Sequence, residues 1–126
     1  MKEVELVFKD IPISLLCPSP NRALRMHWSR RKVLKKKWTQ YFLEHRHKFD
    51  IPIKKCRLIL TRGYVNRRHR LDPDNLTASF KYLIDAMIDA GILEDDSADV
   101  VVSLECRQVK QKRKDHCIRV YVDDLT

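Results

Sequence analysis

The hydrophobic residues of this chain change their spacing along its length, and this change limits the folds that the chain can adopt. They recur every three or four positions over residues 29–47 and again over residues 73–90. This spacing predicts two amphipathic helices. The second stripe includes Leu76 and Phe80, and Gly91 is well placed to end that helix. Each helix would bury its apolar face against another layer of the protein.

Elsewhere, hydrophobic and polar residues alternate, which predicts strands. A first strand over residues 4–8 would continue after a bend through 11–15, and another strand covers 56–64. The last two strands, 99–109 and 116–122, are expected to form a hairpin. The order β-(β)-α-β-α-β-β predicts an α+β fold, with two helices packed on a mixed β-sheet.

The chain is strongly basic, which bears on its partner. Lysine and arginine outnumber aspartate and glutamate by 26 to 17, so the formal net charge is +9. This excess favours a phosphate-rich partner, nucleic acid in preference to a membrane. No apolar run approaches the roughly 18 residues that span a bilayer, and the first residues lack a signal-peptide pattern. We expect a single cytoplasmic domain over residues 1–126.

The four cysteines give no sign of a metal site. No C-x-x-C pair occurs, whereas zinc ligands normally come in close pairs. In a cytoplasmic protein, scattered cysteines are expected to be reduced and partly buried. They are Cys17, Cys56, Cys106 and Cys117.

Acidic residues between basic stretches are the candidate site. Asp72 and Asp74 flank a proline at the start of the second predicted helix, where Asn75 could fix their positions. Oxygen ligands of this kind suit Mg²⁺, with Mn²⁺ as an alternative ion. Asp96, next to Asp95, would join them only if the chain turns back after the helix. The simpler interpretation is an ordinary acidic helix start and a solvated turn.

Lys81 is the candidate cation of this site. It follows Asp74 by seven residues, nearly two turns of a continuous helix, so the two would share a face. Helical side chains lean toward the N-terminus, which would bring the ammonium toward the carboxylates and a bound phosphate. Asp85, four residues further on, could instead pair with Lys81.

Two basic groups are candidates for contact with phosphates. Either group could equally be a solvated loop. They are Arg67, Arg68 and Arg70 before the acidic pair, and Lys110, Lys112, Arg113 and Lys114 between the last two strands.

The acidic motif resembles that of the RusA-type Holliday junction resolvases. The similarity rests on the string Asp-Pro-Asp-Asn-Leu from Asp72, followed by Lys81, Asp85 and the later Asp95-Asp96-Ser97. Pro18-Ser19-Pro20-Asn21 and Arg25-Met26-His27-Trp28 also resemble phage members of this family. In the best-known bacterial member the lysine comes sooner, where this chain has Ala78, so Lys81 takes that role only with about three extra residues in the helix.

The resemblance implies a homodimer that cuts four-way DNA junctions by paired, magnesium-dependent nicks. It assigns catalysis to Asp72, Asp74, Asp96 and Lys81. A two-fold enzyme would match the two-fold symmetry of the junction. Two alternatives stay open: a non-catalytic basic nucleic-acid-binding protein, and the same nuclease chemistry directed at flaps or forks.

Overall fold

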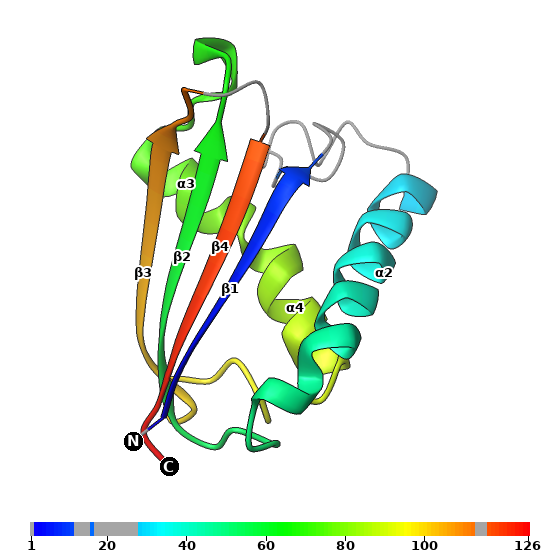
Figure 1. Cartoon of the computed structure of the whole chain (residues 1–126), viewed down its shortest axis with the longest axis vertical. Coiled ribbons are helices and arrows are strands. Elements are labelled where there is room, and N and C mark those ends of the chain that lie inside the picture. The colour runs from blue at the N-terminus through cyan, green and yellow to red at the C-terminus, as the bar shows by residue number, and fades with distance from the viewer. Residues whose placement is uncertain (1, 12–15, 17–27, 113–115) are drawn as a thin grey trace.

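The computed structural model describes residues 2–11, 16, 28–112 and 116–126. In this part of the chain, helices pack on one face of a four-stranded mixed sheet, which confirms the predicted α+β class (Figure 1). The elements are β1 (Lys2–Ile11), α2 (Trp28–His45), β2 (Cys56–Tyr64), α3 (Pro73–Ser79), α4 (Lys81–Asp89), β3 (Val101–Lys110) and β4 (His116–Asp124), with short 3-10 helices η2 (Arg46–Lys48) and η3 (Arg67–His69).

The strand order is β1-β4-β2-β3, so the predicted hairpin between the last two strands is wrong. β4 is antiparallel to both β1 and β2, whereas β3 pairs in parallel with β2 at the edge of the sheet. Just after β3, the Gln111 N–H donates a hydrogen bond to the Tyr64 carbonyl at the end of β2 (2.7 Å). β4 alternates buried and less buried residues, as expected for a sheet covered on one face, while β3 is largely exposed.

The predicted first two strands are only partly described. β1 extends to Ile11, and residues 12–15, where the alternation was expected to continue, lie outside the described residues. The predicted helix over 29–47 is α2 followed by η2. Sequence periodicity therefore located this helix to within one or two residues of each end.

The core lies between α2, α4 and the sheet. Trp38 and Phe42 of α2 and Phe8 of β1 are buried, and the Phe8 and Trp38 rings meet edge to face with centroids 5.2 Å apart. Burial also raises the pKa of the Cys56 thiol to about 11, with a further contribution from Asp124. Cys56, Cys106 and Cys117 are free thiols, as predicted, and Cys17 lies outside the described residues.

The second predicted helix, residues 73–90, is interrupted at Phe80 and forms α3 and α4 instead. The buried Ser79 hydroxyl donates a 2.6 Å hydrogen bond to the Leu76 carbonyl, and the Phe80 N–H bonds the Thr77 carbonyl, three residues back. A side-chain hydroxyl thus occupies the carbonyl that a continuous helix would offer to Phe80. Hydrophobic spacing did not reveal this break, since Leu76, Phe80 and Leu83 are all buried on either side of it.

Replacing Ser79 by alanine should lower the free energy of unfolding by about 1–2 kcal/mol, because a buried carbonyl loses its hydrogen-bond partner. Urea denaturation followed by circular dichroism would measure the loss. Thr77→Ala is the matched control, since its hydroxyl is exposed and bonds the Pro73 carbonyl at 3.2 Å. Equal losses in the two variants would show that burial of the Ser79 hydrogen bond adds nothing to stability.

Candidate functional site

Asp72 and Asp74 lie at the start of α3, as predicted, and both are exposed. Asp72 is the N-cap residue, with an extended backbone (φ −67°, ψ 155°), and Pro73 opens the helix. The Asp72 side chain makes no capping hydrogen bond to the helix. This carboxylate is therefore not occupied in the way that the helix-start interpretation requires.

Asp74 belongs to the first turn of α3 and not to an extended segment. The two residues stay close along the chain because the N-cap and the first turn adjoin. Asn75, the predicted supporting residue, is partly exposed in the same turn. The carboxylates of the pair therefore lie at the end of the helix where the dipole favours negative charge and phosphate.

Gln108 of β3 holds the backbone immediately before Asp72. The Leu71 N–H donates to the Gln108 side-chain oxygen (3.1 Å), and the Gln108 amide donates to the Leu71 carbonyl. This two-way contact connects residues 37 positions apart. Sequence reasoning missed Gln108, because no local pattern links a glutamine in a strand to a distant helix start.

The arginines that precede the pair form η3 and its flank. Arg67, Arg68 and Arg70 are exposed. The Asn66 side chain accepts a 3.0 Å hydrogen bond from the Arg68 N–H, and the buried Arg62 donates to the His69 carbonyl. The segment is therefore attached to the end of β2 while its arginine side chains remain open to solvent.

Part of the second basic group reaches the same end of the sheet. Lys110 pairs with Tyr64, the residue that ends β2 ahead of η3, and Lys110 and Lys112 are both exposed. Arg113 and Lys114 lie outside the described residues. The structure thus gathers basic side chains from two distant segments near the start of α3.

Asp96 lies at the other end of the sheet. The preceding Glu94 N–H bonds the Ile53 carbonyl (3.1 Å), and Asp96 itself donates its N–H to the Asp95 carboxylate (2.8 Å). This loop leads into the start of β3, whereas Leu71 is held near the end of β3 (Figure 1). The seven residue-to-residue steps along the strand from Val101 to Gln108 span roughly 23 Å. One chain therefore does not bring Asp96 to Asp72 and Asp74.

Lys81 is the exposed first residue of α4. Its predicted position on the face of Asp74 assumed one continuous helix, so the break at Phe80 removes that geometric argument. The catalytic role of Lys81 stays a prediction. Asp89, further along α4, forms a 3.0 Å ion pair with Lys35 of α2 and so ties the two helices together.

The donor set at the start of α3 suits a hard cation. Over residues 2–11, 16, 28–112 and 116–126, no group of three or more histidine, cysteine, aspartate or glutamate side chains is placed to hold a metal ion. Magnesium in proteins usually binds through one or two carboxylates and completes its shell with waters and substrate phosphate. The exposed carboxylates of Asp72 and Asp74 fit that description.

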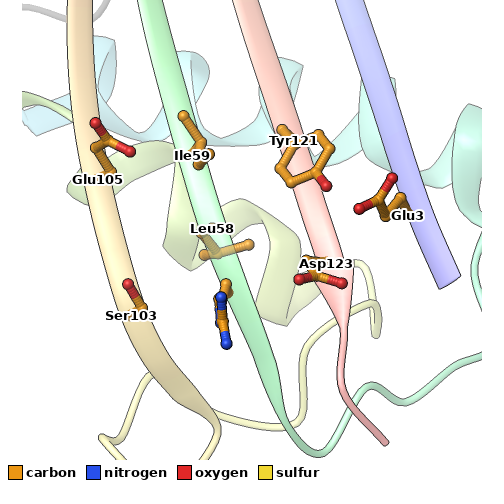
Figure 2. A pocket seen from close by; sticks show the side chains of 8 residues that line it. Glu3, Leu58, Ile59, Ser103, Glu105, Tyr121 and Asp123 are labelled. Atoms are coloured by element: carbon orange, nitrogen blue, oxygen red, sulfur yellow. The ribbon is translucent and has the colours of Figure 1, made fainter. Parts of the chain in front are cut away.

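A shallow pocket of about 370 Å³ lies elsewhere, on the sheet face opposite the helices. Figure 2 shows Glu3 beside Tyr121 on this face, with Ile59 between Tyr121 and Glu105. A hydrogen bond to Glu3, followed by desolvation and nearby acidic charge, raises the pKa of Tyr121 to about 12. None of the predicted catalytic or DNA-binding residues is among the described residues that line it.

No helix in the described ranges is long and apolar enough to cross a membrane. No protein-family model matches the chain, and no curated protein shows significant sequence similarity to it.

Proposed function

We propose that this protein is a magnesium-dependent endonuclease that resolves four-way DNA junctions by paired nicks, acting in the cytoplasm as a homodimer. One observation carries the proposal: two exposed carboxylates, with no capping bond from Asp72, lie at a helix start beside exposed arginines. The resemblance of this motif to the RusA-type resolvases supplies the choice of substrate.

Basic residues would hold the DNA backbone. Arg67, Arg68 and Arg70 adjoin the acidic pair, and Lys110 and Lys112 reach the same end of the sheet. Guanidinium groups bind phosphate through paired hydrogen bonds, and each neutralised phosphate releases counterions. Binding at this end would lay a phosphodiester against Asp72 and Asp74.

Asp72 and Asp74 would hold Mg²⁺ and orient it toward that phosphodiester. The ion, when bound, supplies an activated water and stabilises charge on the phosphate. Gln108 would keep the backbone at Leu71 in place, so that the Asp72 carboxylate is presented at a constant angle. Lys81 would place a positive charge near the phosphate in the transition state.

Asp96 would act with this pair only if a second copy of the chain supplied it, since within one chain it lies near the opposite end of β3. The proposed homodimer makes such an arrangement available. Two copies also provide the two cuts, on opposed strands, that resolution of a junction requires.

A cleavage assay tests the proposal directly. End-labelled four-way junction, flap, fork and linear duplex would be incubated with the protein, with and without Mg²⁺. We expect paired nicks in the junction alone and only with the ion. Equal cutting of flaps or forks would move the substrate assignment to those structures. Tight junction binding without product under any divalent metal would favour the non-catalytic alternative.

A further inference from the structure

β3 is an edge strand whose outer side is open to a partner. Within the described ranges of the chain, its ten residues pair with β2 on one side only, and most of them are exposed. Three large apolar side chains on it are markedly exposed: Val102 (42%), Leu104 (39%) and Val109 (47%). A long edge with exposed apolar residues favours pairing with another strand.

We propose that β3 pairs antiparallel with β3 of a second copy, centred on Cys106, so that two sheets join into one. This proposal rests on the strand itself and does not depend on nuclease activity. A two-fold axis perpendicular to the sheet would relate the copies, which keeps both sets of helices on the same face. An isologous contact of this kind closes at two copies, so it does not extend into a fibre.

Charge selects this register. Glu105 and Arg107 point to the open face and already form two hydrogen bonds within the strand, of 2.9 and 3.0 Å. When Cys106 faces the partner's Cys106, Glu105 lies directly opposite the partner's Arg107, and the reverse contact occurs across the axis. Moving the centre by one residue, to Glu105 or Arg107, would put like charges opposite each other, and moving it by two residues would leave both groups unpaired.

The same register would cover Leu104 on the helix side of the sheet. Leu104 would lie opposite the partner's Gln108, whose side-chain amide is hydrogen-bonded in each copy to the Leu71 backbone. The methylene groups of that glutamine would cover part of the exposed Leu104 side chain. Side chains directly opposite on antiparallel strands approach closely enough for this contact.

Charge reversal tests the pairing. Glu105→Arg and Arg107→Glu each replace two attractive cross-strand contacts with two repulsive ones, because the two-fold axis doubles every change. Sedimentation equilibrium should show a dimer for the unmodified protein and a dissociation constant at least about tenfold higher for each single variant. The double variant E105R/R107E restores opposite charges across the axis and should restore the dimer.

Glu5→Arg is the matched control. Glu5 also lies on the open sheet face, where it pairs with Arg119 at 4.0 Å, but it belongs to β1 and is remote from β3. It should leave the dissociation constant unchanged. A monomer at all concentrations, or single reversals at β3 that dimerise as well as the unmodified protein, would overturn the proposal. Sedimentation equilibrium is measured without DNA, so its result is independent of the cleavage assay.

The register itself can be tested by a disulfide. Residues directly opposite on antiparallel strands have Cα atoms about 4.5–5.5 Å apart, within the range that a disulfide bridges. Copper phenanthroline with dissolved oxygen as electron acceptor should therefore oxidise the two Cys106 thiols to a covalent dimer, seen on a non-reducing gel. Cys106→Ser should abolish that band. A band that persists in C106S, or its absence from a protein that sediments as a dimer, would contradict the Cys106-centred register.

Discussion

Replacement of Asp74 by asparagine should abolish magnesium-dependent junction cleavage while junction binding survives or tightens. The amide retains the size of the carboxylate but loses its negative charge, so it is a much weaker ligand for a hard divalent ion. Loss of one charge-stabilising group at a reacting centre typically slows a reaction roughly 10²- to 10³-fold. At that rate no product would be detected in a gel assay. Binding should persist because the variant removes a charge that repels phosphate.

Asp50→Asn is the matched control for this variant. Asp50 is an exposed carboxylate, paired with Lys2 at 3.6 Å, and Lys2 begins β1 at the end of the sheet away from η3. The same change of charge there should leave cleavage intact. Cleavage by D74N at the rate of the unmodified protein would refute the assignment of Asp74. Loss of junction binding together with cleavage would contradict the proposal that Asp74 acts only by holding the metal ion.

Replacement of Trp38 by alanine should lower the free energy of unfolding by about 3–5 kcal/mol. Trp38 is fully buried, and its ring contacts those of Phe8, Tyr41 and Phe42 with centroid separations of 5.2–6.2 Å. The cavity left by an indole at this junction of α2 and β1 cannot close without moving both elements. Urea denaturation monitored by circular dichroism would measure the change.

The second tryptophan provides the control. Trp28 is 57% exposed, and the Lys32 ammonium lies 4.8 Å from its ring centroid. Trp28→Ala should therefore cost no more than about 1 kcal/mol. Similar losses for W28A and W38A would show that the core described between α2 and the sheet does not provide this stability.

Local sequence patterns predicted the elements well. The stripe containing Leu34, Trp38 and Phe42 located α2, because side chains that point to one side of a helix recur at a fixed interval whatever they pack against. Asp72-Pro73 located the start of α3 for a similar reason, since proline constrains its own backbone and that of its neighbour.

The break at Phe80 and the place of β4 were not predictable in this way. A serine hydroxyl that captures the Leu76 carbonyl leaves the hydrophobic spacing unchanged, so the stripe looked continuous. The alternation in β4 is likewise the same whether its neighbour is β3 or β2. Strand pairing depends on which strands lie inside the sheet with a neighbour on each side, and that is a property of the assembled sheet.

The sequence by itself determined the α+β class, the extent of α2 and the acidic pair at a helix start, because each depends on interactions within a few residues. Only the tertiary structure decided that β4 inserts between β1 and β2, that Gln108 holds Leu71, and that Asp96 lies at the far end of β3. These features arise when segments far apart along the chain compete for the same buried positions. Local spacing carries no information about which segment occupies them.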